Sequence, residues 1–199
     1  MIEVFTDVIC PFCYVAQARV RRVAAEYGVS VRWSLLEIHP ETPAEGMPLE
    51  ALGYPPAVWA ELTEQARRLA EEEGLPYRER TFTTRSRDAL VLLEAAKGLG
   101  AEAFERLQEA VMRAYFAEGR NIGRRGELAA VAREAGMREA LLTTAWDDAD
   151  VQARLAATRR RAGRLGVAGT PTVFVGGRRL VGAVPVRQYR EAVAAARRA

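Results

Sequence analysis

Several residue types are scarce in this sequence of 199 residues, among them the cysteine and histidine that bind zinc. Lysine, asparagine and histidine occur once each, and cysteine occurs only as Cys10 and Cys13. A structural zinc site needs about four nitrogen or sulfur ligands, which two cysteines and His39 cannot supply. We therefore expect no metal ion.

Long apolar segments are also absent. No run of about 18 uninterrupted apolar residues occurs, so we expect no membrane-spanning helix. Residues 1–5 enter a strand pattern directly, without the basic segment, apolar core and cleavage site of a secretory leader. These features predict a cytoplasmic protein with no membrane contact.

Neither sign of charge dominates. The net charge is +3, from 29 basic and 26 acidic residues that are interspersed. Short arginine clusters, such as residues 159–161, lack interleaved aromatic residues and are typical of solvated faces, so we expect no nucleic-acid partner. Apolar residues make up 49% of the chain, enough for a full core without disulfide staples. The two cysteines are thus free for function.

Those cysteines form the most informative motif, Cys10-Pro11-Phe12-Cys13. It lies between an apolar strand pattern and a helical pattern, which places Cys10 at a helix N-terminus. Unpaired N–H groups and the helix dipole favour a thiolate there. Cys13, one turn further, can attack a mixed disulfide on Cys10, and Pro11 suits a first helical turn. We predict that Cys10 is the nucleophile and Cys13 the resolving thiol.

Strand patterns occur only at the two ends of the chain. Residues 2–6, 11–27 and 29–36 read as strand, helix and strand, which predicts a right-handed βαβ unit with parallel strands. Residues 172–181 predict a hairpin with a Gly-Gly turn, followed by a helix over 185–196. Together the ends predict a four-stranded mixed sheet.

The middle of the chain reads differently. Residues 39–57 are rich in proline and glycine and predict an irregular connector. Helical patterns alone follow, most of them ended by glycine, over residues 56–73, 86–99, 101–118, 126–135, 138–146 and 148–165. We predict an α/β fold in which residues 1–38 and 167–199 form one domain and residues 39–166 form an all-helical insertion domain.

A second motif, Gly169-Thr170-Pro171, directly precedes the hairpin. Combined with Cys10-Pro11-Phe12-Cys13 and the helical insertion, it resembles the DsbA family of thioredoxin-fold thiol-disulfide oxidoreductases, and most closely the FrnE-like cytoplasmic branch. The resemblance implies a thioredoxin-like fold in which Pro171 is cis and faces the cysteines. It also implies that Pro11, Phe12, Gly169, Thr170 and Pro171 bind substrate, with the Thr170 backbone aligning an extended substrate on Cys10.

Two residues, Phe12 and Asp7, affect how acidic Cys10 should be, and Thr170 is a further departure from DsbA. In DsbA a histidine precedes the second cysteine, whereas Phe12 here offers neither charge nor donor. Asp7 would raise the pKa of Cys10 by like-charge repulsion, although an ordinary loop carboxylate is the alternative interpretation. Thr170 resembles the isomerase relatives, since DsbA has valine before its cis-proline. We therefore expect Cys10 to be less acidic than in DsbA, and the protein to be a weaker oxidant.

Other candidate side chains have simpler explanations. His39, at the end of the second strand, is interpreted as a satisfied loop residue and not as a general base. Four aromatic residues could line a groove over the cysteines but are expected first as core residues: Trp33, Trp59, Trp146 and Tyr115.

The favoured function is disulfide exchange with a thiol or disulfide of a protein or small molecule, as an isomerase or a reductase. We expect no cofactor beyond the dithiol itself. The redox partner that recycles the dithiol is not identified by the sequence. Glutathione is the candidate co-substrate. Two alternatives stay open: a glutathione-dependent isomerase or transferase of the kappa type, whose members usually carry serine at the position of Cys10, and a non-catalytic thioredoxin-fold binding protein. The sequence indicates no oligomeric state.

Overall fold

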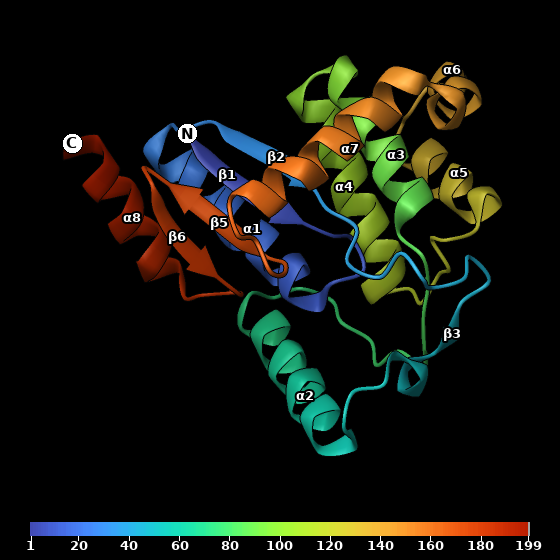
Figure 1. Ribbon diagram of the computed structural model, residues 1–199, viewed down its shortest axis with the longest axis horizontal. Helices are drawn as coiled ribbons and strands as arrows, with labels where there is room; N and C mark the ends of the chain where they lie inside the picture. The colour runs from blue at the N-terminus through green and yellow to red at the C-terminus, as the bar shows by residue number, and fades with distance from the viewer. Residues whose placement is uncertain (199) are drawn as a thin grey trace.

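Four strands form the central sheet of the computed structural model, which describes residues 1–198 (Figure 1). The strand order is β2-β1-β5-β6. β1 (Ile2–Thr6) is parallel to β2 (Val31–Leu35) and antiparallel to β5 (Thr172–Val175), which pairs in turn with β6 (Arg178–Val181). The predicted four-stranded mixed sheet is confirmed.

Helices cover both faces of this sheet. α1 (Pro11–Tyr27) lies behind the sheet in Figure 1 and packs against α8 (Val186–Arg198), which is drawn at the left beside β6 and also contacts β5. α7 (Ala149–Arg164) crosses in front, where Arg161 bonds Glu3 of β1 at 2.8 Å. The apolar face of each helix thus closes one side of the core.

The remaining helices come from the middle of the chain. They are α2 (Pro56–Glu72), α3 (Arg87–Ala96), α4 (Ala101–Phe116), α5 (Arg125–Glu134) and α6 (Glu139–Thr144), with 3-10 turns at Leu49–Leu52, Lys97–Leu99 and Ala145–Asp147. Side chains of the sheet and of α3 and α4 belong to one continuous apolar core. The predicted domain boundaries stay a prediction. Within residues 1–198, no helix has the length and apolarity needed to cross a membrane.

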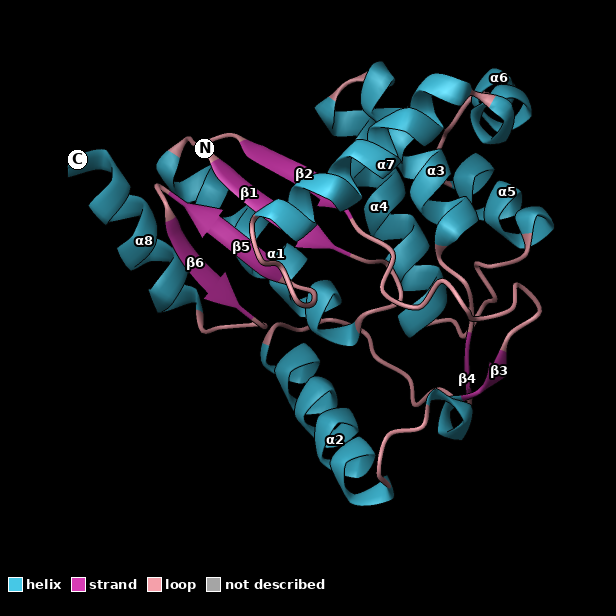
Figure 2. Ribbon diagram, viewed as in Figure 1, coloured by secondary structure: helices cyan, strands magenta, loops and turns pink. Residues whose placement is uncertain are grey.

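One pair of strands contradicts the prediction of a connector followed by helices and loops only. β3 (Met47–Pro48) and β4 (Phe82–Thr83) form a small antiparallel pair beside α2 (Figure 2). Each strand has two residues, too few for an alternating pattern to appear in the sequence. The pair closes the segment from residue 47 to residue 83 into a loop that carries α2.

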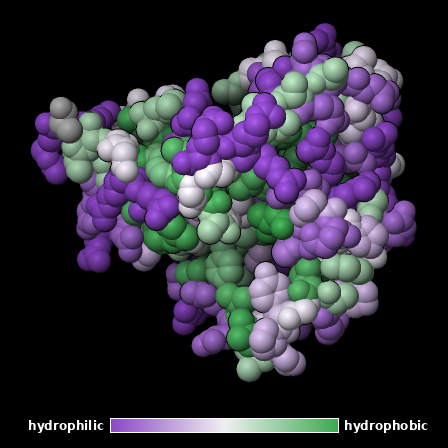
Figure 3. Space-filling model, in the orientation of Figure 1, coloured by the Kyte–Doolittle hydropathy of each residue, from purple (hydrophilic) through white to green (hydrophobic). Residues whose placement is uncertain are grey.

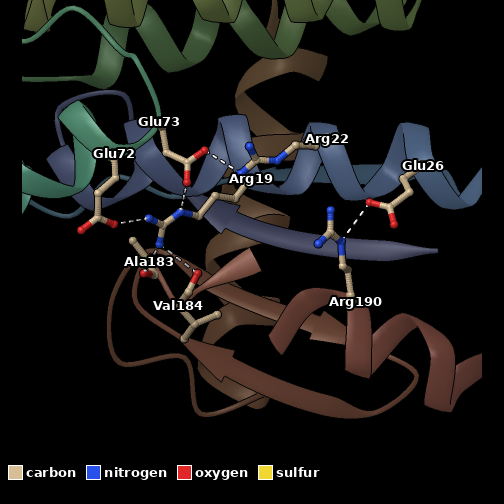
Figure 4. Close-up of polar contacts among 8 residues, drawn as sticks. All are labelled: Arg19, Arg22, Glu26, Glu72, Glu73, Ala183, Val184 and Arg190. Atoms are coloured by element: carbon tan, nitrogen blue, oxygen red, sulfur yellow. Dashed lines mark hydrogen bonds and ion pairs between the residues drawn. The ribbon is translucent and has the colours of Figure 1, made fainter. Parts of the chain in front are cut away.

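The C-terminal end of α2 is joined to α1 by ion pairs, as Figure 4 shows. Arg19 of α1, only 3% exposed, donates from Nε to Glu73 at 2.7 Å and from Nη1 to the carbonyls of Ala183 and Val184 at 2.8 and 3.1 Å. Along α2 itself, only two alanines are buried. One buried arginine therefore joins α1, the end of α2 and the segment before α8.

Candidate active site

Cys10 lies at the start of α1, where the sequence motif predicted it. It is the N-cap residue, with an extended backbone (φ −83°, ψ 117°), and Pro11 follows in the first turn. The Cys10 side chain makes no capping hydrogen bond to the first N–H groups of the helix, and its sulfur lies at the positive end of the helix. Its position can therefore stabilise a thiolate.

The two sulfur atoms have different surroundings. Cys10 Sγ lies 3.3 Å from the carbonyl oxygen of Thr170, which is 160 residues away along the chain. Both cysteines are buried, Cys10 at 5% and Cys13 at 1% exposure, and Cys13 Sγ accepts the backbone N–H of Asp7 at 3.5 Å. Cys10 reaches the wall of a surface cavity, whereas Cys13 lies behind it.

Their pKa values shift in opposite directions. Hydrogen bonding to the Cys13 side chain outweighs burial and lowers the pKa of Cys10. Burial, together with hydrogen bonding to Cys10 and its charge, raises the pKa of Cys13 well above its ordinary value. The arrangement favours one thiolate, on Cys10, with a protonated thiol beside it.

The Gly169-Thr170-Pro171 segment reaches the cysteines from the other end of the chain. The Thr170–Pro171 peptide bond is cis. Thr172, the first residue of β5, donates from Oγ1 to the carbonyl of Gly169 at 2.7 Å and holds the loop in place. Gly169 and Thr170 line the cavity next to Cys10, while Pro171 is buried.

Asp7 is fully buried and so is not an ordinary loop carboxylate. Its Oδ2 accepts the N–H of Ile38 at 2.8 Å and the hydroxyl of Ser86 at 2.9 Å, and Oδ1 accepts the N–H of Ile9 at 3.4 Å. Burial nevertheless raises the pKa of Asp7 to about 6. Its charge is one of the weaker influences on the pKa of Cys10, which it raises, as the sequence analysis expected.

The cavity beside Cys10 has a volume of about 440 Å³ and a largely apolar wall. In Figure 3, apolar surface gathers between the sheet and α2. The wall combines the motif residues with parts of the helical insertion: Ile9, Cys10, Pro11, Phe12, Leu36, Glu37, Ile38, His39, Leu49, Leu52, Tyr54, Trp59, Leu62, Thr63, Tyr77, Arg80, Thr83, Val167, Ala168, Gly169 and Thr170. A pocket of this size can hold a small organic molecule or a few residues of a peptide.

Five of the predicted catalytic and substrate-binding residues lie in one wall of the cavity, and two further sequence candidates, His39 and Trp59, line it as well: the five are Cys10, Pro11, Phe12, Gly169 and Thr170. His39 is in the wall, with Nδ1 3.0 Å from Glu41. Among the four aromatic candidates only Trp59 lines the cavity. Tyr54 and Arg80 also line the cavity but are not predicted from the sequence, because nothing in the local pattern of their segments indicates that these side chains face the cysteines.

Comparisons with known proteins agree with this geometry. Residues 1–194 match the model of the DSBA-like thioredoxin domain family. A probable DsbA oxidoreductase from Streptomyces coelicolor is 27% identical, with a TM-score of 0.86 over 98% of this chain and 88% of that chain. No curated protein matches the sequence.

Two further solved structures are similar in fold alone, at lower identity. The cytosolic disulfide reductase DsbM from Pseudomonas aeruginosa is 22% identical, with a TM-score of 0.67 over 99% of this chain and 95% of that chain. A 2-hydroxychromene-2-carboxylate isomerase is 19% identical, with a TM-score of 0.75 over 99% and 96%. The predicted thioredoxin-like fold is confirmed.

Proposed function

The chain belongs to the DSBA-like thioredoxin domain family of thiol-disulfide oxidoreductases, and from that premise we propose that it exchanges disulfides through Cys10 and Cys13. The Cys10 thiolate attacks one sulfur of a substrate disulfide, whose S–S bond breaks. The first leaving thiolate takes up a proton. Cys13 then loses its proton and attacks Cys10 Sγ, which releases the second substrate thiol. The substrate gains two electrons and the protein retains a Cys10–Cys13 disulfide; the reverse sequence oxidises a dithiol.

The contrast between the two thiols is the observation that carries this proposal. Cys10 combines a lowered pKa with a place in the cavity wall, and Cys13 combines a raised pKa with burial behind it. An attacking group must be ionised and accessible, whereas a resolving thiol is needed only after a mixed disulfide has formed on its neighbour. This division of roles is what the chemistry requires.

The loop at Thr170 is proposed to align the substrate. Its carbonyl lies 3.3 Å from Cys10 Sγ, so a chain extended beside Thr170 brings its own sulfur close to the nucleophile. Gly169, Pro11 and Phe12 line the same wall and are proposed as substrate contacts. Asp7 is proposed to moderate the acidity of Cys10 from below the cavity.

The redox partner and direction are further parts of the proposal. We assign the chain to the cytoplasmic, FrnE-like branch, acting on a protein or small-molecule thiol or disulfide without a bound cofactor. In a reducing cytosol the pair is kept mostly reduced, which favours reduction or isomerisation over net oxidation. A thiol such as glutathione would return the disulfide to the dithiol; the structure of the DsbM relative with glutathione supports this choice.

The first experiment is to equilibrate the protein with a glutathione series and to trap the thiols by acid and alkylation. A reduction potential near about −270 mV would indicate a thioredoxin-like reductase, and one near about −120 to −180 mV an oxidase or isomerase. If no disulfide forms at any ratio, the proposed exchange is wrong.

Cysteine variants test the assigned roles. Cys10→Ser should abolish turnover, and Cys13→Ser should accumulate a mixed disulfide with the substrate, visible by mass spectrometry. Full activity of Cys10→Ser would contradict the assignment. A glutathione-dependent isomerisation that survives the loss of Cys13 would instead favour the kappa-type alternative.

A further inference from the structure

Charged side chains are few in the cavity wall around the reactive cysteine: they are Glu37, His39 and Arg80. His39 is matched by Glu41, 3.0 Å from its Nδ1. Burial raises the pKa of Glu37. The positive charges that lower this pKa, of which Arg87 has the largest effect, belong to arginines outside the cavity wall. Among the described residues, Arg80 is therefore the cationic side chain of this wall that forms no ion pair with a carboxylate.

Contacts on one side fix the position of Arg80. Its Nη1 donates to the hydroxyl of Tyr115 at 2.8 Å, and its guanidinium carbon lies 4.8 Å from the ring centroids of both Tyr115 and Phe116. Within residues 1–198 it pairs with no carboxylate, and its buried Nε has no hydrogen-bond partner. The guanidinium is held by aromatic rings while part of its donor fork is unused.

An unused donor fork in a mostly apolar wall calls for an explanation. A buried donor without a partner is destabilising, and such groups are commonly satisfied by a ligand or by water. The planar guanidinium matches the two oxygens of a carboxylate, and stacking on aromatic rings pre-organises it for that contact. The same cavity contains Cys10, so a molecule bound at Arg80 lies in the space where disulfide exchange would occur.

We propose that Arg80 is a specificity-determining residue that binds the carboxylate of a carboxylate-bearing thiol or disulfide substrate while Cys10 attacks its sulfur. This inference rests on the proposed disulfide exchange and adds the class of substrate. With a diacid disulfide the reaction balances as before: the reduced protein and one disulfide give the Cys10–Cys13 disulfide and two thiol carboxylates. No other reactant is required for the single turnover.

Two small disulfides separate charge from reactivity. 3,3′-Dithiodipropionate carries two carboxylates, and bis(2-hydroxyethyl) disulfide is a neutral molecule of similar length. The oxidation rate of the fully reduced protein is measured with each, by quenching in acid and alkylating the remaining thiols. We expect Arg80→Met to lower the oxidation rate with the diacid by about 10- to 100-fold, which is the effect of losing a hydrogen bond to a charged group. The oxidation rate with the neutral disulfide should change by less than about twofold.

Matched variants keep the test specific. Arg78→Met removes the same charge from an exposed residue of the same loop that does not line the cavity, and it should change neither rate. Arg80→Lys keeps the positive charge but lacks the two parallel N–H donors of a guanidinium, so its oxidation rate with the diacid should lie between those of Arg80→Met and the wild type. An unchanged rate with the neutral disulfide shows that the altered protein still folds around its cysteines.

The outcomes distinguish two failures. If the wild-type protein oxidises with neither disulfide, the proposed function itself is wrong. If both react but Arg80→Met slows them equally, or slows neither, the assignment of Arg80 is overturned. The carboxylate could also belong to an acidic residue beside a cysteine of a protein substrate. In that case Arg80 should bind the side-chain carboxylate, and the protein should react faster with a peptide disulfide flanked by Glu than with the same peptide carrying Gln, a preference that Arg80→Met removes.

Discussion

Replacing Asp7 by asparagine should change how stability depends on pH. Burial raises the pKa of Asp7 from 3.8 to about 6, so the folded state binds this proton more tightly than the unfolded chain does. The stabilisation is complete below about pH 4 and is lost as the pH rises through about 6. A shift of about two pKa units corresponds to about 3 kcal/mol, which is the cost of the ionised, buried carboxylate at pH 8.

Asparagine has nearly the same shape and keeps one oxygen to accept from Ile38 or Ser86, but it carries no charge. We expect Asp7→Asn to be up to about 3 kcal/mol more stable than the wild type at pH 8 and about equal at pH 4. Urea unfolding of the reduced proteins from pH 4 to pH 8 measures the difference. In the same variant the pKa of Cys10, followed by thiolate absorbance, should fall, because the charge of Asp7 raises it.

A second buried acid provides the control of opposite sign. Hydrogen bonding to Arg161 lowers the pKa of Glu3, so its contribution to stability is present at neutral pH and is lost on acidification. Glu3→Gln should therefore destabilise the protein at pH 7 and less so in acid. The reasoning about Asp7 would be refuted if the difference between wild type and Asp7→Asn did not vary with pH, or if the variant were less stable at pH 8.

The remaining predictions concern packing, and each has a matched control measured by urea unfolding. Arg19→Met should cost about 1–3 kcal/mol, because the carbonyls of Ala183 and Val184 lose their buried donor while Arg22 still pairs with Glu73, whereas Arg190→Met removes an exposed ion pair and should cost less than about 1 kcal/mol. Gly123→Ala should cost about 1–3 kcal/mol, because a Cβ would overlap the side chain of Thr84. Gly126→Ala, in helix α5 with open space around its Cβ position, should be neutral or stabilising by up to about 1 kcal/mol. Equal effects within either pair would contradict these explanations.

Local chemistry made much of the fold predictable. The C-terminal hairpin follows from Gly176-Gly177, which adopt φ of 53° and 82°, a backbone that two consecutive glycines accept easily. Likewise, a proline at the first position of α1 and a glycine directly after its end, Gly28 with φ 59°, marked the helix that carries the cysteines. In each case the determining interaction lies within a few residues.

The parts of the site that sequence did not reveal depend on distant contacts. The burial of Asp7 involves Ser86, 79 residues away, and the position of Arg80 is set by aromatic residues of α4. Trp59 and Leu62 have the spacing of one face of a helix, which predicts a buried side but does not say that a cavity lies beneath it. Such placements follow from the packing of whole elements and leave no local pattern.

The order of the strands bears on how this protein emerges from the ribosome. β1 is made first and lies in the interior of the sheet, yet one of its two neighbours, β5, begins at residue 172. Until that segment is synthesised, β1 has an open edge and the Cys10 sulfur lacks the Thr170 carbonyl beside it. Nascent chains therefore carry an open strand edge, and a reactive cysteine without the Thr170 loop beside it, for most of translation, and an open strand edge favours aggregation.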